Sequence, residues 1–201
     1  MRYRTTHEPS SVNGGYDRRV EKTQRALQEV LIALIREKDY DEIAVREILD
    51  RANVGRSTFY THYRDKDELL VSGIREMVRS VSSASPRRSS SRRERFTWFS
   101  LPILEHHDRH RRSSGAVGKQ ARAVLHARLR AVIMNLLCEE MRSAPAPRKT
   151  TQSIPSDLLV DFVASTFVLV LEWWLASRSA LEPSAVNDLF CALVGPVLSR
   201  D

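Results

Sequence analysis

The segment from Gly55 to Tyr63, GRSTFYTHY, places two kinds of side chain at helical spacing. Phe59 and Tyr63 are four residues apart, so in a helix both rings lie on one side, which favours their burial. The other positions carry an arginine, hydroxyl groups and a histidine. Arginine can bind guanine or phosphate, hydroxyls can donate to phosphate oxygens, and a threonine methyl group can contact the methyl group of thymine. This face therefore predicts contact with DNA. Its residues are Arg56, Ser57, Thr58, Tyr60, Thr61 and His62.

A preceding helix and a tight turn must position this segment. Apolar residues such as Ile48 and Leu49 predict a short helix over 45–51, and the following Asn-Val-Gly predicts a three-residue turn. Helix, turn and helix form the helix-turn-helix unit, whose second helix enters the major groove. Two cations frame the unit: Arg46 begins its first helix, and Lys66 begins the next helix, where backbone N–H groups also favour a phosphate.

Periodic apolar residues predict one long helix before this unit and one helix after it. The first helix is expected over 18–38, and residues 1–16 are expected to form a flexible arm because they are polar and lack periodicity. Asp65 and Glu68 match a capping box that starts the helix after the unit. We therefore expect a small trihelical domain at residues 17–64.

The charge of the chain is unevenly distributed. The 201 residues carry a net charge of +7, of which residues 1–80 contribute +1, residues 81–150 contribute +10 and residues 151–201 contribute −4. DNA binding by the first 80 residues must therefore depend on the placement of particular cations. The Ser/Arg-rich segment 82–95 predicts a loop that is either simply solvated or contacts phosphates without sequence preference.

The remainder of the chain has helical periodicity and no strand-like alternation of useful length. The pattern predicts an all-α fold of about nine helices, with a larger domain at residues 65–201. The helices of that domain are expected over 96–110, 119–143, 156–177 and 184–199. We expect Gly195 and Pro196 to bend or fray the last of them.

One apolar stretch, 158–175, approaches the length of a membrane span. It contains Asp161 and Glu172 near its ends and Ser165 and Thr166 at its middle, which favours burial against protein over lipid. The amino terminus lacks the apolar run of a signal peptide. We therefore expect a cytoplasmic protein with no membrane partner.

The run YDEIAVREILDRANVGRSTFYTHYRDKDELL closely resembles the amino-terminal domain of TetR-family (tetracycline-repressor-like) transcriptional regulators. The resemblance covers residues 18–72. It implies that Arg46, Arg56 and the two hydroxyl residues after Arg56 approach bases or phosphates, and that Thr61 lies at the groove. It also implies phosphate contacts by Tyr60, His62 and Lys66. Ala44 departs from the pattern, because the family usually has threonine or serine there as N-cap and phosphate donor.

The resemblance further implies that residues 65–201 dimerise and bind a small effector. Broad apolar surfaces on the last two predicted helices fit a four-helix dimer interface, and the alternative is that both helices are ordinary core of one monomer. The interface candidates are Leu158, Phe162, Leu169, Trp173, Leu189, Phe190, Leu193 and Val197. An aromatic-rich set fits a pocket for an apolar or aromatic effector, or alternatively plain core. The pocket candidates are Phe96, Trp98, Phe99, Leu101, Leu104, Met134, Leu137, Phe162 and Phe167.

Other kinds of chemistry have little support in this sequence. His106 and His110 have a spacing that can bind metal, but no further ligand accompanies them, so we expect neither metal nor cofactor. No Gly-rich phosphate loop or nucleophile elbow is present, so we expect no enzyme. The resemblance implies a dimeric regulator, more often a repressor, that binds a palindromic operator under effector control. The alternative is a TetR-like protein that acts through protein partners without operator binding.

Overall fold

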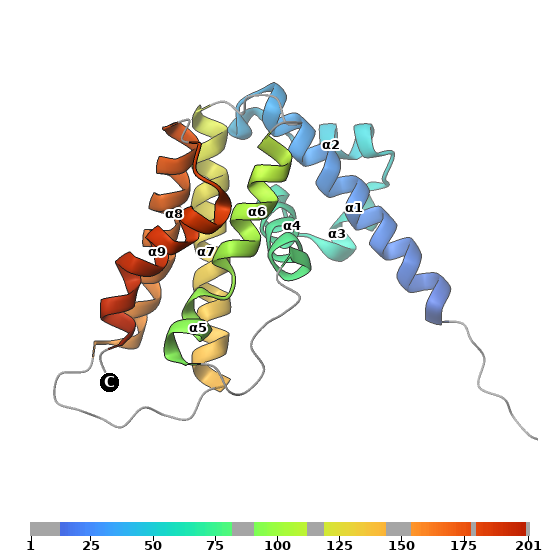
Figure 1. Ribbon diagram of the computed structural model, residues 1–201. Coiled ribbons are helices and arrows are strands. Elements are labelled where there is room, and N and C mark those ends of the chain that lie inside the picture. Colours follow the sequence, from blue (N-terminus) through green and yellow to red (C-terminus); the bar gives the residue numbers. More distant parts are fainter. Residues whose placement is uncertain (1–12, 82–90, 112–118, 144–153, 178–179, 200–201) are drawn as a thin grey trace, which may run out of the picture.

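Nine α-helices and one 3₁₀-helix make up the described part of the chain in a computed structural model (Figure 1). The structure describes residues 13–81, 91–111, 119–143, 154–177 and 180–199, and these contain no strand. The all-α fold class is therefore confirmed. The helices are α1 (Asn13–Glu37), η1 (Tyr40–Glu42), α2 (Val45–Ala52), α3 (Arg56–His62), α4 (Lys66–Val81), α5 (Arg92–Thr97), α6 (Ser100–Arg111), α7 (Lys119–Ser143), α8 (Ser156–Ala176) and α9 (Pro183–Leu198).

Helices α1, η1, α2 and α3 form the amino-terminal unit, which we call the head. The apolar stripe of α1, including Leu27, Leu31 and Leu34, is buried against α2 and α4. α1 begins at Asn13, five residues before the expected start. Residues 13–16 are thus helical and not part of an arm, because an established helix gains one backbone hydrogen bond for each residue added. Residues 1–12 of the expected arm lie outside the described residues.

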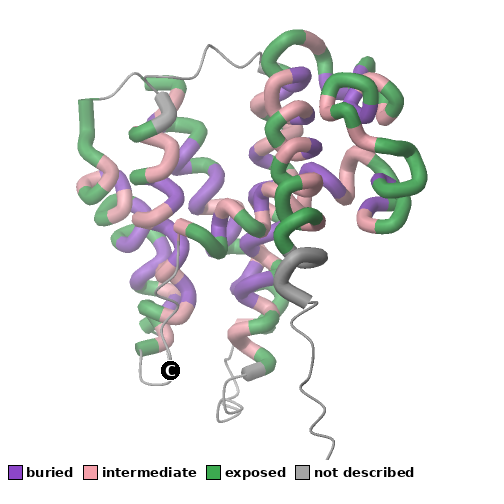
Figure 2. Tube along the Cα trace, turned by 90° about the vertical axis from the view of Figure 1, so that its right-hand side faces the viewer, coloured by how far each residue is buried: buried purple, intermediate pink, exposed green. Residues whose placement is uncertain are grey.

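Helices α4 to α9 form the larger body, and α4 joins it to the head. α4 packs on α1 of the head and on α6 and α7 of the body, while α8 lies between α7 and α9. Figure 1 shows α8 and α9 on the opposite side of the molecule from α2 and α3. The tube in Figure 2 is mostly buried where helices face one another and exposed along their outer sides.

The buried side chains form one continuous hydrophobic cluster that runs from the head through the body. In the body, three aromatic rings make edge or tilted contacts: the ring centroid of Phe99 lies 5.1 Å from that of Phe167 and 6.2 Å from that of Phe190. The centroids of Phe167 and Phe190 are 5.4 Å apart. Contacts of this kind add to the free energy gained by burying the rings.

The Ser/Arg-rich region differs from the expected loop. Helix α5 begins at Arg92, because the side chain of Ser91 accepts a hydrogen bond from the Glu94 backbone N–H while the Glu94 carboxylate accepts one from the Ser91 N–H. This reciprocal capping box starts a helix inside the predicted loop. Residues 82–90, the rest of that loop, lie outside the described residues.

The last turns of α9, where we expected a bend or fraying, remain helical. The helix continues through Gly195 and Pro196 to Leu198. A proline so near the carboxyl end removes only one N–H donor, and the following Ser199 N–H still donates to the Gly195 carbonyl over 3.0 Å.

Helix α8 is long and apolar enough to cross a membrane by length and composition alone. Its 21 residues include a window with a mean hydropathy of 1.8, and half of that window is buried inside the structure. Its neighbours α7 and α9 cover this half. Such burial is typical of the central helix of a water-soluble fold.

Candidate nucleic-acid interface and ligand cavity

The turn between α2 and α3 is set by an asparagine. Asn53 caps α2 in the left-handed conformation, with φ of 52° and ψ of 46°. Asparagine tolerates this region better than most residues do. Gly55 has φ of −66°, so its backbone does not require glycine, although the sequence suggested that glycine makes the turn. The N–H of Val54 donates to the Leu49 carbonyl over 3.0 Å and closes the turn.

The inner face of α3 holds the helix in the head. Phe59 is fully buried and Tyr63 is 4% exposed, as their spacing predicts. Their ring centroids are 5.7 Å apart. Burial raises the pKa of the Tyr63 hydroxyl. This apolar anchor fixes which side of α3 faces solvent.

The outer face of α3 gathers most of the predicted DNA contacts. Arg56, Ser57, Thr58 and Thr61 are exposed, and Tyr60 retains 48% of its accessible surface. The guanidinium of Arg56 lies over the Tyr60 ring, 5.5 Å from its centroid, so these two side chains share one surface. The remaining member, His62, is half-buried.

Two further predicted contacts lie at the start of α2. The Arg46 side chain is 92% exposed and forms a 3.6 Å ion pair with Asp50 one turn later. An exposed pair of this kind is weak, so the guanidinium can exchange its partner for a phosphate at little cost. Ala44 is the N-cap of α2 and offers no side-chain hydrogen bond, as expected.

The structure gives Lys66 a different role from the predicted phosphate clamp. Its ammonium donates to the carbonyl oxygens of Tyr40, Asp41 and Ile43 at 2.7, 3.2 and 2.9 Å. It also lies 4.6 Å from the centroid of the Tyr40 ring. The three carbonyl oxygens converge at the end of η1, and an ammonium group has three N–H donors to match them. The side chain therefore turns inward. Lys66 thus fastens α4 to the head.

A neighbouring polar link ties the head to the body. The Tyr40 hydroxyl donates to the Asp67 carboxylate over 2.9 Å, and a guanidinium N–H of Arg128 on α7 donates to the same oxygen over 2.5 Å. Burial, followed by this bond to Asp67, raises the pKa of Tyr40. This link is not predictable from the sequence, because 61 residues separate Asp67 from Arg128 and no local pattern connects them.

The comparison with known families identifies the head. Residues 29–72, which run from the middle of α1 into α4, match the model described as bacterial regulatory proteins, tetR family. The head is a TetR-family domain. The match covers η1, α2 and α3 completely, so the buried anchor and the exposed polar face of α3 both lie inside it.

Curated relatives match this chain over short stretches. The uncharacterized HTH-type transcriptional regulator YxbF of Bacillus subtilis (strain 168) is 39% identical over 66 residues, which are 32% of this chain and 17% of YxbF. An uncharacterized HTH-type regulator of Mycobacterium tuberculosis (strain ATCC 25618 / H37Rv) is 32% identical over 74 residues, which are 37% of this chain and 35% of the relative. The chain thus matches well under half the length of these relatives.

Solved TetR-family structures match along nearly the whole chain. A TetR transcriptional regulator from Streptococcus agalactiae 2603V is 26% identical, with a TM-score of 0.55 over 90% of this chain and 97% of that one. One from Rhodococcus sp. RHA1 is 14% identical, with a TM-score of 0.52 over 90% and 97% of the two chains. The body therefore has the TetR-family fold as well.

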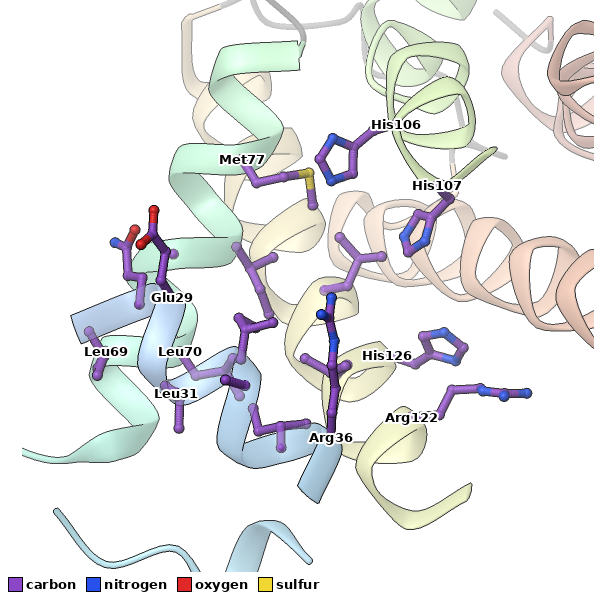
Figure 3. Close-up of a pocket in the computed structure, with 18 of the residues that line it drawn as sticks. Glu29, Leu31, Arg36, Leu69, Leu70, Met77, His106, His107, Arg122 and His126 are labelled. Atoms are coloured by element: carbon purple, nitrogen blue, oxygen red, sulfur yellow. The ribbon is translucent and has the colours of Figure 1, made fainter. Parts of the chain in front are cut away.

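A cavity of about 920 Å³ lies where the TetR-family head meets the body (Figure 3). Its walls come from α1, α4, α6 and α7, with Leu175 of α8. Such a volume is within the usual range for small-molecule sites. The apolar part of the lining includes Leu31, Ile35, Leu70, Ile74, Met77 and Leu129.

None of the nine predicted pocket residues lines this cavity. Phe96, Phe99, Leu104, Leu137 and Phe167 are buried core residues. Trp98, Leu101 and Met134 are half-buried, and Phe162 is exposed on α8. Aromatic rings fill volume when they pack on one another, so the aromatic-rich part of the body is solid and the cavity forms among smaller side chains.

Sequence reasoning also missed the polar lining of the cavity. It includes Arg36 from α1, His106 and His107 from α6, and Arg122 and His126 from α7. A usable signal exists for α7, where Arg122 and His126 lie one turn apart on the face that carries Leu125 and Leu129. The predicted partner of His106, His110, has no described side chain, and the described residues contain no group of three or more metal-binding side chains.

Most of the predicted interface residues form an exposed apolar stripe. On α8, Leu158, Phe162, Leu169 and Trp173 are 58%, 37%, 63% and 47% exposed. On α9, Leu189 and Leu193 are 43% and 54% exposed, and Val197 is half-buried. Phe190 is fully buried and belongs to the aromatic core. It lies one residue from Leu189, so about 100° of helix rotation turns it inward.

Proposed function

We propose that this TetR-family chain is a transcriptional regulator that binds a palindromic operator through α3. The observation that carries the proposal is the exposed polar face of α3, with Arg56 stacked on Tyr60, above the buried ring of Phe59. Arg56 and the hydroxyl residues after it supply base and phosphate contacts. Tyr60, His62 and the exposed Arg46 add contacts to the phosphate backbone. We place its action in the cytoplasm.

We further propose that the chain acts as a homodimer joined through α8 and α9. The exposed residues of α8 are spaced four, seven and four apart, so they lie along one side of the helix. A contiguous apolar stripe of this kind marks an interface, and a twofold axis lets the same stripe meet its own copy. Two heads are needed because an operator presents successive major grooves about 34 to 36 Å apart.

We propose that an effector bound in the cavity controls the orientation of the two heads. The cavity is walled by α1 of the head and by α6 and α7 of the body, so a bound molecule contacts both. A ligand that fits one head orientation better than another shifts the population toward it. We propose a repressor whose effector favours an orientation that cannot span the operator.

The test is operator binding by fluorescence anisotropy. The purified protein is titrated with labelled DNA from upstream of its own coding region and with a random duplex, at several salt concentrations. We expect a clear preference for the upstream fragment at two chains per site. Arg56→Ala and Tyr60→Phe should weaken that binding, whereas Arg142→Ala, an exposed arginine at the end of α7, should not.

Two results would contradict the proposal. Equal, salt-sensitive binding to both duplexes would mean that the protein binds DNA only by nonspecific electrostatic attraction. No binding even at low salt would favour the alternative of a regulator that works through protein partners. Unchanged affinity in both α3 variants would contradict the residue assignments alone.

A further inference from the structure

Arg56 differs from the other lysines and arginines of residues 44–66 in the partners that it has. Three of those cations form ion pairs with carboxylates, and a fourth donates to backbone carbonyls; they are Arg46, Arg51, Arg64 and Lys66. Arg56 has no ion pair with a carboxylate in the part of the chain that the structure describes. It can therefore bind DNA without giving up a charged partner.

The ring of Tyr60 supports the guanidinium of Arg56. The Cζ atom of Arg56 lies 5.5 Å from the centroid of this ring, one turn further along α3. The Tyr60 ring in turn makes an edge contact with the buried ring of Phe59, with 5.2 Å between centroids and 89° between planes. A guanidinium that lies on an aromatic face still presents N–H donors at its edge to a bidentate partner. The contact therefore limits the orientations of Arg56 before DNA is bound.

The residue types on α3 narrow down which base this helix can recognise through two hydrogen bonds. Its seven residues, RSTFYTH, include no carboxylate and no amide side chain. A carboxylate would accept a hydrogen bond from cytosine N4, and asparagine or glutamine would bind adenine in a bidentate manner. Arginine instead donates two hydrogen bonds to O6 and N7 of guanine. Guanine is therefore the base for which α3 offers a bidentate partner.

We propose that Arg56 recognises a guanine in each half of the operator and that the Tyr60 ring positions the guanidinium for this contact. The inference rests on the proposed operator binding and names the base that the site recognises. Residues near the start of a recognition helix contact base edges when that helix lies in the major groove, and Arg56 is the first residue of α3. Tyr60 acts through Arg56 and is a positioning residue, while its hydroxyl contacts phosphate as proposed above.

The first experiment lets the full chain select duplexes from a pool whose central segment is randomised, and the bound duplexes are sequenced. We expect a palindromic motif with a guanine in each half. Arg56→Gln should change the preferred base at that position to adenine, because glutamine pairs with adenine. Arg46→Gln is the matched control. It should lower the affinity for every duplex by a similar factor and keep the motif, since a phosphate contact carries no sequence information.

A modified base tests the hydrogen bonds themselves and needs no protein variant. Each guanine of the motif is replaced in turn by an analogue with carbon in place of N7, and affinity is measured by fluorescence anisotropy. At the guanine that Arg56 contacts, the analogue should lower wild-type affinity roughly fivefold or more. Arg56→Ala should bind the natural and modified duplexes equally well, because it lacks the donor that N7 accepts.

Two substitutions at Tyr60 separate the role of the ring from that of the hydroxyl. Tyr60→Phe keeps the ring, so it should lose affinity equally for the guanine duplex and for the same duplex with adenine at that position. Tyr60→Ala lacks the ring and should also lower the preference for guanine, by about two- to fivefold. A Tyr60→Ala variant that keeps the full preference would contradict the positioning role.

The remaining outcomes distinguish the inference from the proposed function. A motif that the Arg56→Gln protein selects unchanged contradicts the inference and leaves operator binding intact. Wild-type affinity that is insensitive to the analogue at every guanine has the same meaning. A wild-type selection that yields no motif contradicts the proposed function, and the inference fails with it.

Discussion

Phe59 and Tyr60 are neighbours on α3 and lie in opposite environments. Phe59 is fully buried, whereas Tyr60 is 48% exposed. Phe59→Ala should lower the free energy of unfolding by roughly 3 to 5 kcal/mol, because it removes a buried ring and leaves a cavity. Tyr60→Ala is the matched control and should change stability little while it weakens operator binding. Chemical denaturation of both variants checks the contrast, and equal losses would contradict the assigned faces.

Ala44 is a position where the head lacks a helix cap. Its φ of −86° and ψ of 145° are those of an N-cap, and its side chain is exposed. Ala44→Ser should therefore raise the free energy of unfolding by about 0.5 to 2 kcal/mol, because the hydroxyl can accept a hydrogen bond from the first turn of α2. Ala44→Val has no such acceptor and serves as control, because valine is as poor an N-cap as alanine. A serine variant no more stable than the valine variant would refute the capping explanation.

The environment of a residue was predictable from the sequence where it depends on neighbours a few residues away. The spacing of Phe59 and Tyr63 predicts their burial, which the structure confirms. The environment of Lys66 was not predictable, because its three carbonyl partners lie 23 to 26 residues away on η1 and its flanks. Nothing in the local sequence tells an inward-turned lysine from a solvated one.

At the scale of elements, the start of α4 is the joint between head and body. Lys66→Met should lower the free energy of unfolding by about 1 to 3 kcal/mol, since it leaves partly buried carbonyls without their donor. Arg64→Met removes a nearby cation whose side chain is 87% exposed, so the free energy of unfolding should change little. Thermal or chemical denaturation measures both. A Lys66 variant as stable as the Arg64 variant would return Lys66 to the role of a free phosphate contact.

Helix positions were largely predictable, and their exceptions have local causes. The expected ranges of α2, α7, α8 and α9 agree with the structure to within one residue at each end. Helix α5 was missed because its Ser-x-x-Glu cap sits in a segment whose composition indicates a loop. The cavity was misplaced because hydrophobic patterns reveal which side chains are buried, and not where their packing leaves a space.

At the scale of the whole molecule, the exposed apolar stripe on α8 should determine whether the chain is a monomer or a dimer. Leu169, at 63% the most exposed leucine of the stripe, should lie at the centre of a dimer contact. Leu169→Glu should shift sedimentation from a dimer to a 23.0 kDa species, because it places a charge in an apolar interface. Leu181→Glu is the matched control, since Leu181 is 39% exposed outside α8 and α9. A wild-type monomer, or a Leu169 variant that still dimerises, would refute this interface.

The boundary between the DNA-binding domain and the larger domain, placed between residues 64 and 65, remains a prediction. The continuous hydrophobic cluster affects how the domains of such regulators can be recombined. The cluster crosses that division through α4, and the hydrogen bond from Tyr40 to Asp67 crosses it as well. A chimaera that joins this head to the body of a relative at that point would face an unmatched surface. A transferred head should fold on another body only if α4 and the facing residues of α7 are transferred with it. The exchangeable unit is therefore larger than the part that reads DNA.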